Sequence, residues 1–267
     1  MIMFKFVILF VLLAGSLALN SRVIGGFEPE PHQFPYLVSV IWEFPPLLPQ
    51  RHVCGGVIVS PEWIVTAASC IEKYGKLSIK SGKHNLAVYE PSEETREVQF
   101  SVIHKDYKKA SILNRIPKNN IALLKLKFPL NLSTYSQALN FEYTSDNYSG
   151  DVTVIGWGGK NEILPIPEAA SAPLLPWDSC LEVLRISYKN IKLEDTNICT
   201  GPIGGTISAC SQDIGGPLVK YNEQKQPQLV GIVSWTNKPC GKNGLPTVYT
   251  HVPNYIDWIN DKLEASK

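Results

Sequence analysis

Cysteine is the residue type with the clearest chemistry in this chain. The 267 residues contain six of them: Cys54, Cys70, Cys180, Cys199, Cys210 and Cys240. An even count in a chain that begins like an exported one favours disulfides in an oxidising compartment over metal ligation. We therefore expect three disulfides, although six cysteines allow fifteen connectivities and their spacing selects none of these.

The histidines are candidates for proton transfer or metal binding, but their spacing favours neither. They are scattered along the chain as His32, His52, His84, His104 and His251. None of these spacings is that of a metal-binding pair. We interpret them as surface or core residues, and we expect no metal and no cofactor.

Short apolar stretches between Gly, Pro and Asn turns must position these groups. Seven stretches are typical of β-strands: 36–42, 53–59, 64–67, 121–126, 152–157, 229–235 and 248–252. The composition, 44% hydrophobic and 18% charged, is that of a packed globular protein. We predict an all-β fold. The polar stretch 141–150 divides the strands into two sets, which fits two β-barrels of roughly 110 residues each.

The C-terminal end has a different periodicity. Tyr255, Ile256, Ile259 and Leu263 recur at helical spacing behind Pro253. We predict a helix over residues 253–265 that packs against the body.

The first residues have the pattern of an export signal. Lys5 precedes an apolar run over residues 6–13, and small residues follow up to Ala18. We predict a signal peptide over residues 1–18 and a secreted, extracellular protein. An uncleaved anchor is the alternative, but the run is shorter than the roughly 20 residues of a membrane span. Two N-glycosylation sequons, at Asn131 and Asn147, fit the same route.

The overall charge excludes one class of partner. Lys and Arg number 25 and Asp and Glu number 24, which leaves a net charge of +1. The chain therefore has no global positive field of the kind that captures nucleic acid, so we expect no nucleic-acid partner and only local electrostatic contacts. Since no later apolar run has the length of a membrane span, we also expect no membrane partner.

A series of motifs carries a resemblance to a known family. In chain order they are Arg22-Val23-Ile24-Gly25-Gly26, Cys54-Gly55-Gly56, Trp63-Ile64-Val65-Thr66-Ala67-Ala68, Ile121-Ala122-Leu123-Leu124, Gly156-Trp157-Gly158, Gly215-Gly216-Pro217, Gly231-Ile232-Val233-Ser234-Trp235 and Val248-Tyr249-Thr250. They resemble the landmarks of a trypsin-like serine protease of the S1 family, over essentially the whole mature chain. The resemblance implies two six-stranded antiparallel β-barrels with a C-terminal helix, the chymotrypsin-like fold.

The resemblance also implies how the chain is divided and cross-linked. A pro-segment would cover residues 19–22 and the trypsin-like domain residues 23–267, with barrels at about 23–135 and 136–252. The implied disulfides are Cys54 with Cys70, Cys180 with Cys199, and Cys210 with Cys240.

The three catalytic positions of the resembled family are occupied by other residues here. Ser69 stands where the family has its general-base His, Asn120 where it has the orienting Asp, and Ile214 where it has the nucleophilic Ser. A Ser hydroxyl does not accept a proton near neutral pH, and Ile has no atom that attacks a carbonyl. We therefore predict that the chain is not an enzyme.

The substrate-binding positions differ as well. Gln212 replaces the oxyanion-hole Gly, and its side chain is expected to turn the peptide away. Ser208 lies at the base of the specificity pocket, where members selective for Arg or Lys have Asp, and Thr236 and Thr247 replace two Gly at its mouth. The resemblance thus implies a crowded pocket without a counter-ion for a cationic side chain.

Two further features match positions of the family. Arg22 and Val23 form an intact activation junction, at which a cut would free an amino group to pair with Asp213. An acidic cluster, composed of Glu90, Glu93, Glu94 and Glu97, lies where some members have a calcium loop. We interpret this cluster as a solvated face.

A finer resemblance is to mite group-3 trypsin-like allergens and to the inactivated protease paralogues of the scabies mite. It is carried by residues 76–80, 120–127 and 247–259. It implies a secreted, monomeric pseudoprotease that binds an extracellular protein and interferes with host defence, such as the complement cascade. The alternatives are a regulator or decoy in an endogenous protease cascade, a residual hydrolase that uses Ser69 or Ser211, and a structural or storage protein.

The candidate contact for a protein partner is the segment 43–52, which is longer than in the resembled family. Phe44, Leu47 and Leu48 are apolar, and three Pro stiffen the segment. These side chains either bind the partner or cover a small satellite core.

Overall fold

The computed structural model describes residues 26–112, 114–141, 149–159, 162–201, 203, 205, 207–241 and 244–265. The predicted signal peptide and pro-segment, the junction at Arg22 and Val23, and the sequon residue Asn147 lie outside these ranges.

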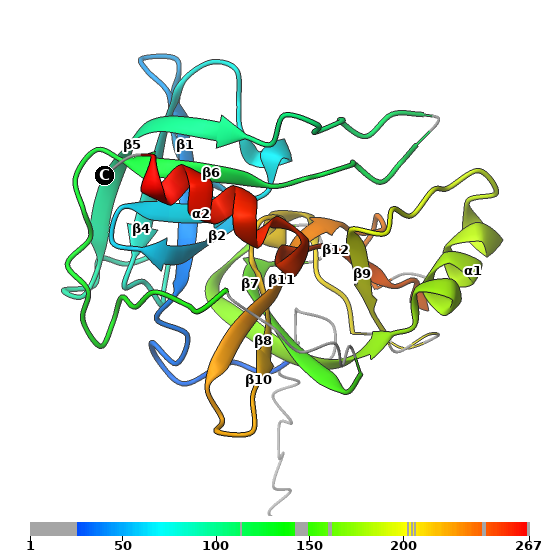
Figure 1. The fold of residues 1–267 in the computed structure, drawn as a ribbon. Coiled ribbons are helices and arrows are strands. Elements are labelled where there is room, and N and C mark those ends of the chain that lie inside the picture. The colour runs from blue at the N-terminus through cyan, green and yellow to red at the C-terminus, as the bar shows by residue number, and fades with distance from the viewer. Residues whose placement is uncertain are drawn as a thin grey trace, which may run out of the picture.

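The first six strands form a closed barrel in the order β1-β2-β3-β6-β5-β4 (Figure 1). They are β1 (Leu37–Phe44), β2 (Leu48–Ser60), β3 (Trp63–Thr66), β4 (Lys76–Ser81), β5 (Glu94–Ile103) and β6 (Ala122–Leu126). All neighbouring strands are antiparallel, and pairing of β1 with β4 closes the barrel.

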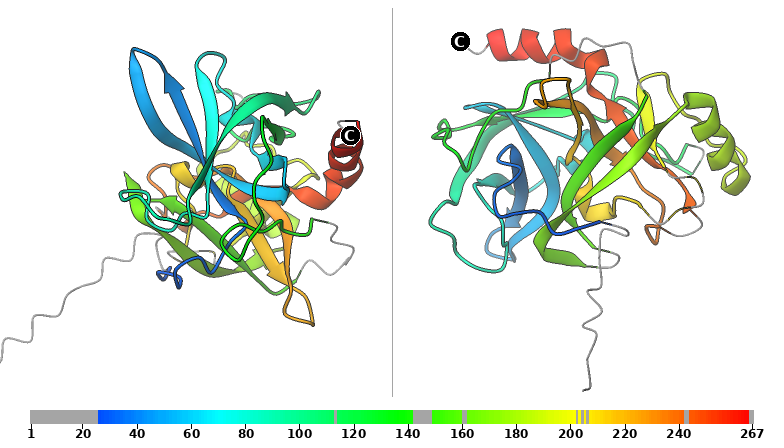
Figure 2. Two further views of the ribbon diagram at one scale, coloured as in Figure 1. Left: turned by 90° about the vertical axis from the view of Figure 1, so that its left-hand side faces the viewer. Right: turned by 90° about the horizontal axis from the view of Figure 1, so that it is seen from below.

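The last six strands form a second closed barrel in the order β10-β11-β12-β9-β8-β7. They are β7 (Asp151–Gly158), β8 (Ile163–Leu175), β9 (Asn197–Thr200), β10 (Pro217–Tyr221), β11 (Pro227–Trp235) and β12 (Thr247–His251). Figure 2 shows the two barrels side by side. The predicted all-β, double-barrel fold is confirmed.

Five strands were not predicted from the sequence, namely β4, β5, β8, β9 and β10. In β5 the side chains are half-buried or exposed and include Glu94, Arg96 and Glu97, so no apolar run marks the strand. In β8 three prolines at positions 165, 167 and 173 argue against a strand, but the pairing with β7 tolerates them.

Two helices accompany the barrels. α1 (Trp177–Ser187) was not predicted, although Cys180, Leu181 and Leu184 form its buried face. The predicted C-terminal helix is present as α2 (Ile256–Glu264) after a 3₁₀ turn over Val252–Tyr255. Val252, Tyr255 and Ile259 pack in one core cluster with Trp63 and Leu123 of the first barrel. The chain therefore ends by joining the second barrel to the first.

The disulfides have the pairing that the resemblance implied. They are Cys54–Cys70, Cys180–Cys199 and Cys210–Cys240. Within the described ranges, neither α1 nor α2 is long and apolar enough to cross a membrane.

Candidate functional site

The three positions singled out as catalytic meet where the barrels join. Ser69 lies on the 3₁₀ turn η1 (Ala68–Cys70) after β3, and the Cys54–Cys70 disulfide ties this turn to β2. Asn120 precedes β6, and Ile214 follows the 3₁₀ turn η2 (Ser211–Asp213). The structure thus brings a hydroxyl, an amide and an alkyl group to one junction.

Asn120 is the buried centre of this junction. Its Oδ1 accepts the Ser69 backbone N–H at 2.8 Å, and its Nδ2 lies 3.2 Å from Ser69 Oγ. Nδ2 also donates to Ser234 Oγ at 3.0 Å and lies 3.3 Å from the Ser234 carbonyl oxygen. One amide therefore connects the first barrel to β11 of the second.

Ile214 reaches the junction because a glycine follows it. Its side chain packs against the core clusters of both barrels, and its carbonyl accepts the Gly55 N–H at 2.9 Å. Gly215 has φ +83°, and a Cβ there would lie 2.3 Å from Thr66 Oγ1 and 2.5 Å from the Gly55 carbonyl oxygen. No other residue type allows the segment to approach the first barrel so closely.

A cleft of about 360 Å³ opens at this junction. Its lining includes the apolar side chains Ile214, Trp235, Tyr188, Tyr107 and Pro117, the hydroxyl residues Ser69, Ser211, Ser234 and Thr236, and the cations Lys109, Arg115 and Lys238. The cleft therefore combines an apolar wall with hydrogen-bonding and positively charged groups, which suits a polypeptide segment.

The three hydroxyl residues predicted to line a specificity pocket are buried in the second barrel or at the cleft. Ser208 and Thr247 are buried with their hydroxyl oxygens 3.4 Å apart, and Thr247 Oγ1 accepts the Ala209 N–H at 3.1 Å. Thr236 is buried as well. At the positions where the resemblance places a specificity pocket, hydroxyl side chains thus satisfy one another and the backbone.

Asp213 is a fully buried carboxylate behind the junction. It accepts backbone N–H groups from Gly158 at 2.6 Å and from Cys210 at 2.7 Å. Desolvation raises its pKa from 3.8 to about 6, and the two hydrogen bonds oppose this rise. The carboxylate also requires glycine on β7, since a Cβ at Gly156 would lie 2.0 Å from Asp213 Oδ1.

Sequence reasoning gave no role to His52, which the structure places in a buried polar chain. Its Nδ1 lies 2.7 Å from Ser39 Oγ, and its Nε2 lies 3.1 Å from the Gln212 carbonyl oxygen. Burial lowers the pKa of His52, against the opposing effect of the Gln212 carbonyl. A neutral ring whose Nε2–H donates to Gln212 leaves Nδ1 free to accept the Ser39 hydroxyl proton.

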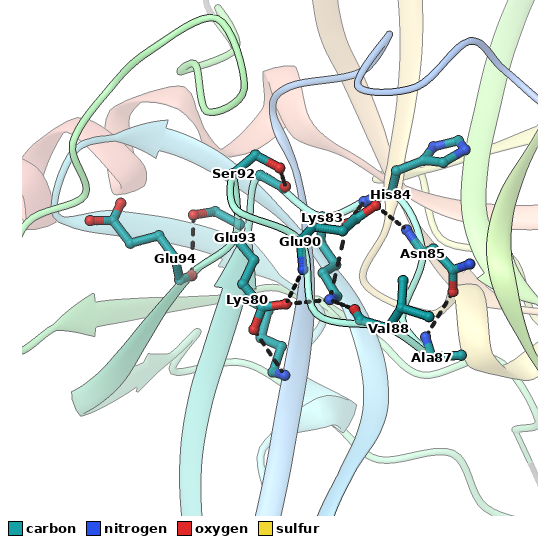
Figure 3. Close-up of polar contacts among 12 residues, drawn as sticks. Lys80, Lys83, His84, Asn85, Ala87, Val88, Glu90, Ser92, Glu93 and Glu94 are labelled. Atoms are coloured by element: carbon teal, nitrogen blue, oxygen red, sulfur yellow. Dashed lines mark hydrogen bonds and ion pairs between the residues drawn. The ribbon is translucent and has the colours of Figure 1, made fainter.

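Two members of the acidic cluster, Glu90 and Glu93, lie around a buried lysine rather than facing solvent. Glu94 pairs with Arg96 instead, and Glu97 forms an exposed pair with Lys127, as expected for a solvated face. Figure 3 shows the Lys83 ammonium between Glu93, the Val88 carbonyl and Glu90. The Lys83 side chain is 1% exposed, and Lys80 contacts Glu93 at 3.4 Å. Glu90 instead accepts the backbone N–H groups of His84 and Asn85. In the part of the chain that the structure describes, no group of three His, Cys, Asp or Glu is placed to hold a metal ion.

Two further features predicted from the sequence are the segment 43–52 and the sequon at Asn131. The segment expected as a loop is mostly strand, because β1 and β2 pair out to Phe44 and Leu48. At its tip Leu47 and Leu48 are exposed, whereas Phe44 stacks on Trp42. The sequon residue Asn131 is exposed, and its side-chain amide donates to Glu94 at 2.6 Å.

Comparisons with known proteins agree with this architecture. The family model described as Trypsin matches residues 23–259. The chain is 30% identical to trypsin-4 of Rattus norvegicus and 29% identical to kallikrein 1-related peptidase b22 of Mus musculus, in each case over 97% of this chain and 98% of the relative. It is 37% identical to ovochymase of Halocynthia roretzi, over 78% of this chain but 13% of ovochymase.

These comparisons contradict the prediction that the chain is not an enzyme. Relatives matched over nearly their whole length have the names of peptidases. The structure also contains the Ser39–His52 hydrogen bond, the type of contact that activates a nucleophile in hydrolases, although both residues are buried. The prediction considered three positions and overlooked this pair. By its fold and by the match over residues 23–259, the chain belongs to the trypsin family.

Proposed function

We propose that this member of the trypsin family is secreted and acts on another protein by binding one of its segments in the cleft between the barrels. The observation that carries the proposal is the cleft itself, which has an apolar wall at Ile214, Tyr188 and Trp235. Lys109, Arg115 and Lys238 add positive charge to its lining, which favours a segment with acidic residues.

The buried hydroxyl residues restrict how such a segment is held. Ser208 and Thr247 are buried and their hydroxyl oxygens lie 3.4 Å apart, so we expect a long side chain of the partner to find no deep pocket at these positions. The segment is expected to lie across Trp235 and Thr236 instead. Binding would then depend on the apolar wall more than on one inserted side chain.

The partner is proposed to be an extracellular protein, in keeping with the three disulfides. Complement components of a host are the first candidates, on the resemblance to the mite paralogues alone. The proposal includes maturation by a cut after Arg22. N-terminal sequencing of the secreted protein tests this step, and a start near Leu19 alone would contradict it.

A binding experiment tests the cleft. Immobilised full-length protein is exposed to purified complement components and to an extracellular peptide library, and the Trp235→Ala variant should bind at least tenfold more weakly. Ile186→Ala is the matched control, because Ile186 is 79% exposed on α1 and is absent from the cleft lining. Equal binding by wild type and Trp235→Ala would contradict the proposal.

Mass spectrometry of the bound polypeptides adds a second readout. It reports directly whether a peptide bond is cut. If one is cut, Ser39→Ala and His52→Ala test whether the buried pair is required, since loss of cutting with retained binding would show that cutting depends on it.

A further inference from the structure

A strongly basic groove lies beside the proposed cleft and shares only Lys109 with the described lining of that cleft. It is bounded by the connection from β5 to β6 on one side and by the end of α1 with residues 189–194 on the other, and its volume is about 1020 Å³. Figure 1 shows this long connection extending toward the side of the molecule where α1 lies. Six cationic side chains line the groove: Lys108, Lys109, Lys118, Arg185, Lys189 and Lys192.

The protein compensates the charge of this groove only in part: Glu194, Asp106 and Asp195 all act on Lys118. Glu194 is the one carboxylate in the described lining, and it pairs with Lys118 at 2.9 Å. Across the described ranges, no ion pair to a carboxylate includes Lys108, Lys109, Arg185, Lys189 or Lys192. The whole chain is almost neutral, with 25 basic and 24 acidic residues, so the groove is a local concentration of positive charge.

Such a concentration is unfavourable without an anion. Like charges that line one groove repel one another within the Debye length of about 8 Å at physiological salt. A bound polyanion removes this repulsion and releases the counterions held near both surfaces. The groove is therefore a site for negative charge rather than a neutral surface.

The shape of the site favours a polymer over a small anion. A second cavity, of about 270 Å³, shares Lys189, Asn190 and Ile191 with the groove and adds Arg115. The cations thus follow a continuous path from Lys192 to Arg115. Asn114, Asn190 and Ser111 supply neutral hydrogen-bonding groups between them.

The chemistry of the lining distinguishes between polyanions. No described residue that lines the larger groove is aromatic, so nucleic-acid bases have no stacking surface along that part of the path. In the described lining of the adjoining cavity the one aromatic residue is Tyr188, and the Arg115 guanidinium lies over its ring at 4.7 Å. Ile191 is the one apolar side chain in the described lining of the larger groove, and it is 3% exposed. The adjoining cavity adds the exposed Ile112, so an acidic protein finds little apolar surface along the path to anchor it. A sulfated sugar polymer needs neither feature, because it presents sulfates and hydroxyls along its length.

We propose that this groove binds a sulfated polysaccharide of the glycosaminoglycan type. Lys109 and Arg115 belong to the linings of both this basic path and the protein-binding cleft. A bound polysaccharide would therefore hold the protein at an extracellular matrix or cell surface with one end of the chain next to the cleft. The proposal does not depend on what the cleft binds.

The test measures binding of full-length protein to heparin oligosaccharides at several salt concentrations. The triple variant Arg185→Gln, Lys189→Gln, Lys192→Gln should bind at least tenfold more weakly than wild type, with a shallower dependence of log Kd on log salt. The control variant Lys73→Gln, Lys76→Gln, Lys225→Gln has the same net charge and changes exposed lysines outside the groove. It should change the Kd by less than about threefold.

Comparison ligands decide the class of polyanion. Desulfated heparin, poly-glutamate and a single-stranded oligonucleotide should each bind at least tenfold more weakly than heparin. Equal binding by any of them would overturn the assignment to sulfated sugar. Equal losses in the two triple variants, or no binding of wild type to heparin near 0.15 M salt, would overturn the site itself. Circular dichroism verifies that both variants are folded, as expected for changes at exposed side chains.

Discussion

The side chain of Asn120 contacts Ser69 through both of its polar atoms. Oδ1 accepts the Ser69 backbone N–H at 2.8 Å, and Nδ2 lies 3.2 Å from the Ser69 hydroxyl. Nδ2 also reaches Ser234 on the second barrel at 3.0 Å, and Asn120 is 1% exposed. Since water cannot replace these contacts, the amide stabilises the junction between the barrels.

Asn120→Asp should therefore destabilise the protein by about 1 to 3 kcal/mol at pH 7. The substitution keeps the shape but replaces the Nδ2 donor by a charged oxygen that faces the Ser234 carbonyl oxygen. Urea unfolding measures the effect. Asn222→Asp is the control, because Asn222 keeps its acceptor role toward the Gln226 N–H in an exposed turn.

Adding Ser69→His should recover part of that loss, because an imidazole at the exposed position 69 could donate to the new carboxylate. Additive effects of the two substitutions would show that positions 69 and 120 do not interact through their side chains.

Contacts between residues of recognisable motifs could be predicted from the sequence, whereas a contact that depends on strand register could not. Motif order placed Ser69, Asn120 and Ile214 at one junction, because landmarks of the resembled family flank each of them. The Ser39–His52 pair was missed for a physical reason. The register of β1 and β2 shifts between the pairs Val40↔Cys54 and Ile41↔His52, and a bulge of this kind changes which side chains meet without leaving a sequence signal.

A second prediction concerns the pH dependence of stability through Asp213. Burial raises its pKa in the folded protein to about 6, from 3.8 in the unfolded chain. Between these values the folded state binds more protons, so this group lowers the free energy of unfolding as the pH rises from about 4 to 6, by about 3 kcal/mol in all. In the chain not cut after Arg22, Asp213→Asn should flatten that part of the pH profile, measured by urea unfolding from pH 4 to 6.5. Parallel profiles for wild type and variant would contradict the assignment.

A third prediction concerns Lys83 and the loop over residues 83–93, which surrounds its ammonium group (Figure 3). Lys83→Met keeps the length of the buried side chain but leaves Glu93 without its central cation. We expect a loss of roughly 1 to 3 kcal/mol in the free energy of unfolding, less than for a fully buried pair because Glu93 is partly solvated. Lys127→Met, which disrupts an exposed pair with Glu97, is the control and should cost under about 0.5 kcal/mol.

The contacts of Glu93 in this loop also determine how the stability of the protein depends on pH. Desolvation raises the pKa of Glu93, but Lys83 and Lys80 together outweigh this and hold it below the ordinary value of 4.5. The contribution of Glu93 to stability is therefore present above pH 4.5 and is lost as the pH falls through the lowered pKa. Lys83→Met should weaken this acid dependence. A chelator should leave the melting temperature of wild type unchanged, and a clear decrease would show that the loop holds a metal ion.

The double-barrel fold was predicted correctly from the sequence, but five of the twelve described strands and one of the two described α-helices were not. Strands with apolar runs, such as β3 and β6, were predicted because both of their faces are buried. β5 was missed because none of its side chains is fully buried and polar residues interrupt its apolar ones. α1 was missed because polar residues separate its apolar ones, and only Cys180, Leu181 and Leu184 are buried. For elements of this kind the tertiary pairing, rather than local composition, decides the structure.

The last prediction concerns the tip of the β1–β2 hairpin. Leu47 and Leu48 are 71% and 47% exposed, whereas Phe44 stacks on Trp42 with ring planes at 4°. Leu47 and Leu48 are therefore available to bind a partner, whereas Phe44 packs on the body.

Leu47→Ser with Leu48→Ser should weaken capture of the protein partner at least tenfold, about 1.4 kcal/mol, and leave the melting temperature nearly unchanged. Phe44→Ser should lower the melting temperature, because it removes a packed ring. Ile186→Ser, the same type of change at an exposed site on α1, is the control for both measurements. Unchanged capture by the folded double variant would exclude the hairpin tip from the interface.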